Sequence, residues 1–195
     1  MKRLVLLRHS LTEANARRLY CGATDVPLSP EGRALAVEKR EMISPCEFHI
    51  TSGMKRTDET LDLLTSQKPD RVFEGLREMD FGAFEMRSYD ELKALPEYQR
   101  WIMDETGHIP CPGGESRADF QNRVLAAGQA LLNLKADSAL VVCHGGVIAA
   151  LMAAWFPDEP RHFYQWQPAP CEGWRVFIAD GRPARFEDSI IPNIN

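Results

Sequence analysis

Apolar residues along this chain follow two alternating patterns: short continuous runs, and longer stretches with helical character. The runs "LVLL" (residues 4–7) and "ALVVC" (139–143) have the length and continuity of strands buried on both faces. Between such runs lie helix-start signals, such as Ser29 before Pro30. Strands are predicted over residues 3–7, 47–52, 71–75, 139–143, 174–180 and 184–188. Helices are predicted over 29–42, 55–66, 117–135 and 147–156, with shorter helical pieces at 88–95 and 97–107.

The alternation of strands with helices predicts an α/β fold. We expect a three-layer sandwich, in which a mainly parallel central sheet has helices on both faces. Residues 1–195 fit a single domain, and the less regular stretch at about 84–115 is predicted to be a lid or insertion within it.

Polar side chains follow two of the predicted buried strands at the point where each strand ends. Arg8 and His9 come directly after the first run, and His144 with two glycines follows the run 139–143. In open α/β sheets, ligands bind beyond the carboxyl ends of the strands. We therefore expect both histidines to meet at one rim of the sheet.

Composition narrows the classes of partner. The formal net charge of −5 argues against nonspecific nucleic-acid binding, although a local arginine cluster can still hold a small anion. No apolar run reaches transmembrane length and no signal-peptide pattern is present, so we expect no membrane association and a cytoplasmic location. The five cysteines form no C-x-x-C pair, so neither a disulfide framework nor a zinc site is predicted.

Each candidate side chain has an ordinary structural interpretation when it is considered alone, but together the candidates suit phosphoryl transfer. A neutral imidazole, as in His9 or His144, can attack phosphorus and split a difficult transfer into two steps. The guanidinium groups of Arg8 and Arg56 match phosphoryl oxygens and offset their charge. A protonated Glu78 could protonate the leaving oxygen, and the helix after "HGG" would add backbone N–H donors. This chemistry needs no metal or other cofactor, and no carboxylate cluster suited to magnesium is present.

Six motifs in this chain, in the same order, resemble those of the histidine phosphatase superfamily, the phosphoglycerate mutase-like branch. They are "LLRHSLTEAN", "GATDVPLSPEG", "TSGMKRTDET", "LREMDFGAFE", "PGGES" and "VVCHGGVI". The resemblance implies that His9 is the nucleophile that becomes phosphohistidine. It also implies that Arg8, Arg56 and His144 complete the phosphate pocket, and that Glu78 donates a proton to the leaving group.

The resemblance also implies a set of substrate-binding positions, namely Asn15, Ser10, Gly22 and Gly145. Ser10 stands where the family has glycine. If the backbone there needs a glycine-only conformation, the serine costs about 1 kcal/mol or more. It could instead donate a hydrogen bond to the phosphate or orient the nucleophile. Asp80 is a second acidic candidate, for which capping of a turn is the favoured interpretation.

The segment after Glu78 lacks the Arg-His-Tyr that follows the acid in mutases, and the chain is short. Both observations favour a metal-independent phosphomonoesterase that acts on a small phosphorylated metabolite, and the motifs look most like those of enzymes such as alpha-ribazole phosphatases. A phosphoglycerate mutase-type transfer and a catalytically silent phosphate-binding protein remain alternatives, and a homodimer is left open. The aromatic residues Tyr89, Tyr98 and Trp101 indicate either a ring-bearing leaving group or simple packing of the lid.

Overall fold

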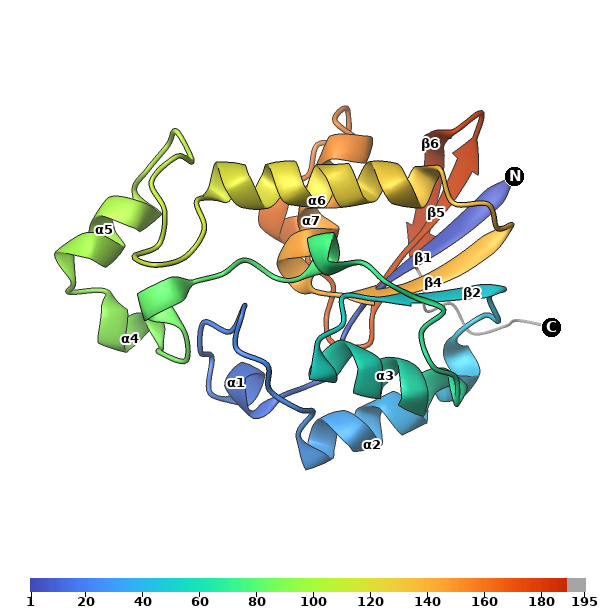
Figure 1. The fold of residues 1–195 in the computed structure, drawn as a ribbon, viewed down its shortest axis with the longest axis horizontal. Helices are drawn as coiled ribbons and strands as arrows, with labels where there is room; N and C mark the ends of the chain where they lie inside the picture. Colours follow the sequence, from blue (N-terminus) through green and yellow to red (C-terminus); the bar gives the residue numbers. More distant parts are fainter. Residues whose placement is uncertain (189–195) are drawn as a thin grey trace.

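A six-stranded sheet forms the centre of the molecule in the computed structural model, which describes residues 1–188 (Figure 1). The strands lie in the order β3-β2-β4-β1-β5-β6. Neighbouring strands from β3 to β1 pair in parallel, whereas β5 pairs antiparallel with both β1 and β6. Their bounds are β1 Lys2–Arg8, β2 Phe48–Thr51, β3 Arg71–Val72, β4 Ser138–Cys143, β5 Gly173–Ala179 and β6 Arg182–Asp188. The predicted mixed α/β fold with a mainly parallel sheet is confirmed.

Helices cover the sheet on both faces. In Figure 1, α2 and α3 lie below the sheet, and α6 and α7 lie above it, which gives the predicted three layers. The α-helices are α1 Glu13–Ala16, α2 Pro30–Lys39, α3 Lys55–Thr65, α4 Tyr89–Leu92, α5 Pro96–Ile102, α6 Arg117–Leu132 and α7 Gly145–Trp155. Short 3₁₀ helices are η1 Arg40–Met42, η2 Glu74–Leu76, η3 Gly82–Phe84 and η4 Phe163–Trp166.

The alternation of side chains along β1 explains its uninterrupted apolar sequence. Leu4 and Leu6 are fully buried in the large core that includes apolar residues of α6 and α7. Val5 and Leu7 point to the other side and join a smaller core with leucines of α3. Burial of such side chains contributes on the order of 1.5–3 kcal/mol each. The strand is therefore held firmly from both faces, and its last residue occupies a defined position.

Several predicted elements differ in their bounds from those observed, and two of these differences lie next to the predicted site. The strand expected over 71–75 pairs only at Arg71–Val72, and the chain then turns into η2, where Leu76 is buried against the core. The helix expected from 147 begins two residues earlier, because His144 acts as its N-cap residue and both following glycines are helical.

The predicted lid region contains α4 and α5, which lie at the end of the molecule toward which β1 and β4 run (Figure 1). Its aromatic residues mainly pack against one another. Tyr98 is almost fully buried, and its ring lies 5.5 Å from Phe84 and 5.7 Å from Trp101. Tyr89 is 56 % exposed on the outside. The packing interpretation therefore holds for Tyr98, while Trp101 has a second role, described below.

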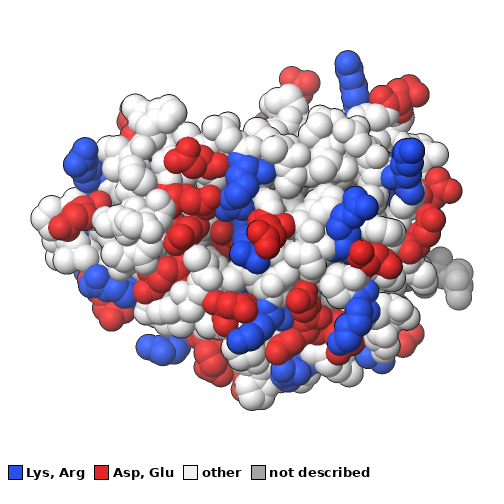
Figure 2. Space-filling view, in the orientation of Figure 1, with Lys and Arg blue, Asp and Glu red and all other residues white. Residues whose placement is uncertain are grey.

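Acidic and basic side chains are interspersed over the face drawn in Figure 2, and that face carries no extended basic patch. Within residues 1–188, none of the helices combines the length and the apolar character needed to cross a membrane.

Candidate active site

The register of the sheet brings the two predicted histidines together. β1 and β4 pair in parallel with Arg8 opposite Cys143, so His9 and His144 both follow at the same edge. The backbone N–H of His9 donates to the carbonyl of Cys143 over 2.9 Å. The two imidazole rings meet edge to face, with their centroids 5.2 Å apart. The expectation that these histidines share one rim of the sheet is confirmed in the geometry.

His9 is held so that one ring nitrogen is free for attack. Its Nδ1 lies 2.7 Å from the carbonyl oxygen of Ser10, and since a carbonyl only accepts, Nδ1 carries the proton and Nε2 carries the lone pair. Only 6 % of the residue is exposed. Burial, with the positive charges of Arg56 and Arg8, lowers the pKa of His9 to about 3, despite the opposing effect of the bond to Ser10. The imidazole is therefore neutral at neutral pH.

Two arginines lie beside the histidines with their guanidinium groups fixed by backbone carbonyls. Arg56, in the first turn of α3, is 1 % exposed and donates to the carbonyls of Thr24 (2.9 Å) and Gly22 (2.7 Å). Arg8, at the end of β1, donates to the carbonyl of Pro168 over 2.9 Å. These bonds leave the Nε of each arginine without a partner.

His144 is anchored by a chain of hydroxyl groups. The Thr57 hydroxyl donates to the Met54 carbonyl over 2.7 Å, so it accepts from Ser52 over 3.1 Å. Ser52 then accepts from Nε2 of His144 over 2.8 Å. Burial, followed by the charge of Arg56, lowers the pKa of His144 well below its ordinary value. The neutral ring keeps its Nδ1 without a partner.

The pocket thus contains three buried nitrogen atoms that have no hydrogen-bond partner among residues 1–188. They are Nε of Arg8, Nε of Arg56 and Nδ1 of His144. Buried polar atoms are nearly always paired with protein, water or a ligand, so an unpaired set in one place suits the binding of a polar ligand. Two guanidinium groups beside an imidazole match a phosphoryl group in charge and in donor geometry.

Glu78 lies at the N-terminus of α7, beside the histidines. One carboxylate oxygen accepts from the N–H of Gly146 over 2.9 Å, and the other accepts from the N–H of Met79 over 3.0 Å. A side chain at position 146 would displace the acid, because its Cβ would lie 2.5 Å from the Glu78 carboxylate. The second glycine of "HGG" therefore permits the acid to reach the pocket.

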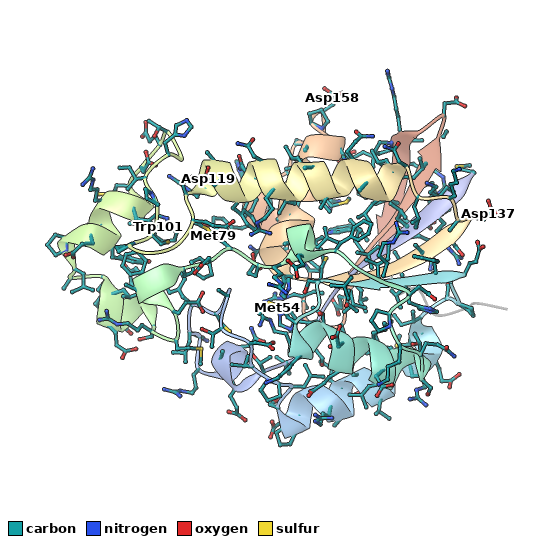
Figure 3. All side chains as sticks on the ribbon, viewed as in Figure 1. Met54, Met79, Trp101, Asp119, Asp137 and Asp158 are labelled. Atoms are coloured by element: carbon teal, nitrogen blue, oxygen red, sulfur yellow. The ribbon has the colours of Figure 1, made fainter. Side chains whose placement is uncertain are left out.

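A cavity of about 590 Å³ extends from this pocket toward the lid. Arg8, Glu78 and Gly146 line its inner end, and Trp101, Phe120 and Tyr164 line its outer part. Figure 3 shows Trp101 on the lid side and Met79 nearer the sheet, both of which also line the cavity. The indole N–H of Trp101 is buried and has no partner. The cavity can therefore hold an organic group attached to a phosphate bound at His9.

Comparison with known proteins shows the family to which the chain belongs. The family model of the histidine phosphatase superfamily (branch 1) matches residues 4–186. The chain belongs to this superfamily.

Two kinds of relative are found within the superfamily. A protein of Salmonella choleraesuis (strain SC-B67), named "Probable phosphoglycerate mutase GpmB", is 33% identical over 159 residues, which are 78% of this chain and 74% of that protein. The crystal structure of the alpha-ribazole phosphatase from Shigella flexneri superposes with a TM-score of 0.83 at 25% identity and covers 93% of each chain. That of phosphoglycerate mutase from Thermus thermophilus has a TM-score of 0.73 at 30% identity and covers 94% of this chain and 97% of its own.

The serine that replaces the superfamily's glycine after the nucleophile is accommodated without strain. Ser10 is not among the described residues with positive φ. It is fully buried, its hydroxyl donates to the carbonyl of Gly32 over 2.7 Å, and its N–H donates to the hydroxyl of Thr60 over 2.9 Å. The hydroxyl proton is already used in the bond to Gly32, which disfavours the alternative in which Ser10 donates a hydrogen bond to the phosphate.

The other predicted substrate positions differ in what they contact. Gly22 lies so close to the acid segment that a Cβ would be 1.6 Å from the carbonyl oxygen of Met79. Gly145 brings the backbone against Arg8, with a Cβ position 3.3 Å from the guanidinium carbon. Asn15 lines the cavity, and its side chain also caps α1. Direct contact of these residues with a substrate stays a prediction.

Glu85 is a site residue that the sequence did not single out. Its carboxylate accepts from the N–H groups of Gly22, Ala23, Thr24 and Phe81, and from the Thr24 hydroxyl, over 2.7–3.2 Å. The same loop supplies the two carbonyls that hold the arginine of α3. The only signal in the sequence was the position of Glu85 at the end of the motif "LREMDFGAFE".

Asp80 caps a turn, which was the favoured interpretation of this residue. Its carboxylate accepts from the N–H of Gly82 over 2.8 Å and so caps the turn after the acid. Of the histidines that match no motif, His49 pairs with Asp70 over 3.5 Å, and His108 is exposed in the lid.

Proposed function

We propose that this protein is a phosphomonoesterase that works without a metal and acts on a small phosphorylated metabolite through a phosphohistidine intermediate. One observation carries the proposal. A buried, neutral histidine with a free Nε2 lies among three unpartnered nitrogen atoms and beside one carboxyl group. Each of these groups has a necessary task in the transfer of a phosphoryl group to histidine and then to water.

The first step is attack by Nε2 of His9 on phosphorus. The N–P bond forms as the P–O bond to the organic group breaks, and the departing oxygen takes a proton from the carboxyl group of Glu78. In the second step, a water molecule gives a proton to the Glu78 carboxylate and its oxygen attacks phosphorus. The N–P bond breaks, inorganic phosphate is released, and both His9 and Glu78 return to their initial states.

Arg8, Arg56 and, once protonated, His144 would bind the phosphoryl oxygens. The guanidinium donors of the two arginines are fixed by backbone carbonyls before a substrate arrives, so little reorganisation is needed when charge moves onto these oxygens. A phosphate dianion in the pocket also favours protonation of His144, because a negative charge near an imidazole raises its pKa. His144 could then donate from Nδ1 as well as from Nε2.

A second candidate function is mutase-type transfer, in which a bound intermediate accepts the phosphoryl group in place of water. The mutase names of the Salmonella and Thermus relatives favour it. One feature supports the phosphatase: the sequence after Glu78 is Met-Asp-Phe rather than the Arg-His-Tyr of mutases. Alpha-ribazole phosphate is one candidate substrate, since the Shigella relative is named as a phosphatase for it.

The test is hydrolysis of p-nitrophenyl phosphate in the presence of EDTA, between mildly acidic and neutral pH. We expect turnover that does not depend on added metal. Folded protein that shows no turnover would leave the catalytically silent alternative in place. A screen of phosphorylated metabolites, compared by kcat/KM, would then identify the preferred substrate class.

A further inference from the structure

The proton donor lies in a segment that has neither helix nor strand hydrogen bonding to hold it. Glu78 follows η2 and precedes η3, and residues 77–81 belong to no regular element. Its carboxylate is bonded only to N–H groups, one of them on its own neighbour. Something else must therefore fix the backbone of this segment relative to the nucleophile.

Arg123, on α6, contacts this backbone at three points. Its Nη1 donates to the carbonyls of Gly75 (3.0 Å) and Arg77 (2.9 Å), and its Nη2 lies 3.4 Å from the carbonyl of Glu78. The same guanidinium forms a bidentate pair with Glu115, with N–O distances of 2.8 and 2.7 Å. Such forked pairs are stronger and geometrically stricter than single hydrogen bonds.

Glu115 connects to the same segment from its other side. Its carboxylate accepts from the N–H of Asp80 over 3.0 Å, and its own N–H donates to the carbonyl of Asp80 over 2.9 Å. Two glycines allow the loop around Glu115 to lie this close. A Cβ on Gly82 would be 2.3 Å from the carbonyl of Pro112, and one on Gly114 would be 2.4 Å from that of Asp80.

We propose that Glu115 and Arg123, here called the acid clamp, are positioning residues that set the placement of Glu78 for proton transfer. This inference rests on the proposed function. Neither residue lines the cavity that would hold the organic group. Both line a separate cavity, which Glu78 also lines. They act through the backbone and not through contact with substrate. The phosphate-binding residues lie on β1, α3 and the β4–α7 junction, so loss of the clamp leaves them in place.

The test uses two substrates that differ in their need for an acid. p-Nitrophenolate leaves readily without a proton, whereas the alkoxide of benzyl phosphate requires one. For Arg123→Gln and for Glu115→Gln, we expect kcat/KM on benzyl phosphate to fall about 10-fold to 100-fold, and on p-nitrophenyl phosphate by less than about 3-fold. Arg123→Lys keeps the charge but not the fork, so its loss should be intermediate.

The ratio of the two kcat/KM values is the decisive readout, because it does not depend on how much of a variant is folded. Arg185→Gln, which removes an exposed pair with Glu187 on β6, is the matched control and should leave the ratio unchanged. In a Glu78→Gln background, Arg123→Gln should have no further effect on the ratio, since the acid is already absent.

Two results would overturn the proposal. One is an unchanged ratio of the two kcat/KM values in both clamp variants. The other is that Arg123→Gln changes this ratio as much in the Glu78→Gln background as it does in the unaltered protein. Either result would leave the proposed function intact, provided that the unaltered protein hydrolyses p-nitrophenyl phosphate. Failure of the unaltered protein to hydrolyse either substrate would instead overturn the proposed function.

Discussion

The phosphate pocket and the acid segment lie next to each other but are built in different ways. His9, Arg8 and His144 lie at or directly after the ends of two paired strands, and their spacing follows from the register of the sheet. Glu78 lies on an irregular segment, and the side chains of Glu115 and Arg123, from distant parts of the chain, contact the backbone of that segment. Regular structure thus fixes the nucleophile, and individual charged hydrogen bonds fix the acid.

This difference has an energetic consequence. Moving the histidines apart requires disruption of a buried parallel pair, which is coupled to the stability of the whole sheet. Moving Glu78 requires the loss of individual hydrogen bonds to charged side chains, each contributing roughly 1.5–3 kcal/mol, without disruption of the sheet. Substitutions near the acid should therefore change the reaction selectively, while damage to the strand ends should abolish it.

The largest effect is expected for His9→Ala, which removes the nucleophile itself. Turnover should fall by about 10⁴-fold or more, with no acid-labile phosphoenzyme on acid quench after incubation with labelled substrate. His108→Ala, an exposed lid histidine, serves as the control and should label normally. Labelling that persists in His9→Ala would place the nucleophile elsewhere.

Glu78→Gln should have the next largest effect, and one that depends on the substrate. Loss of the acid should reduce kcat/KM on alkyl phosphates by about 10²-fold to 10⁴-fold. The loss on p-nitrophenyl phosphate should be much smaller, because that leaving group needs little protonation. Equal losses on both substrates would contradict the assignment of Glu78 as the proton donor.

Adjacent glycines allow the two regions to be separated directly. A methyl group at Gly146 would lie 2.5 Å from the Glu78 carboxylate, so Gly146→Ala should slow alkyl esters selectively, by about 10-fold. A methyl group at Gly145 would instead lie 3.3 Å from Arg8, so Gly145→Ala should affect good and poor leaving groups alike. Steady-state kinetics on p-nitrophenyl and alkyl phosphates would measure the selectivity of each variant. If both variants slowed the two ester types to the same extent, the acid segment and the phosphate pocket would not act separately.

The smallest effect is a pH dependence of stability. Since the pKa of His9 is lowered to about 3 in the folded protein, the unfolded chain binds a proton below about pH 6.5 that the folded chain does not. The contribution of His9 to the free energy of unfolding is therefore fully present above about pH 6.5 and is lost as the pH decreases toward 3. Between pH 7 and pH 5, the change is about 2 kcal/mol.

Urea unfolding at these two pH values, compared between the unaltered protein and His9→Asn, isolates this contribution. The unaltered protein should lose more stability than the variant. If the difference in unfolding free energy between the unaltered protein and His9→Asn is the same at both pH values, the pKa of His9 is not lowered in the folded state.

The comparison also shows what could be predicted from the sequence. The apolar runs that end at Arg8 and at His144 predicted both strands and their common rim, because a parallel sheet leaves few alternatives. The strand at residues 71–75 was predicted too long, since its sequence does not reveal that Leu76 is needed in the core. The sequence shows that Ser10 departs from the family's glycine. It does not show that the Ser10 hydroxyl donates to Gly32, because that contact depends on how α2 packs.

The acid segment was less accessible to prediction. Glu78 was identified from its motif, but the functions of Glu85 and Arg123 depend on contacts between residues 45 to 63 positions apart. No local periodicity encodes such pairs. The motif "PGGES" contained Glu115 without indicating its partner, which only the packing of α6 against η2 defines.

The position of β1 in the sheet has a consequence for synthesis of the protein. Its neighbours are β4 and β5, at residues 138–143 and 173–179, so β1 is synthesised long before either strand with which it pairs. A nascent chain therefore carries an unpaired, strongly apolar segment until nearly all of these residues have left the ribosome. Folding of the sheet is expected to be largely post-translational, and a chain that stalls before β4 would be exposed to aggregation and to capture by chaperones.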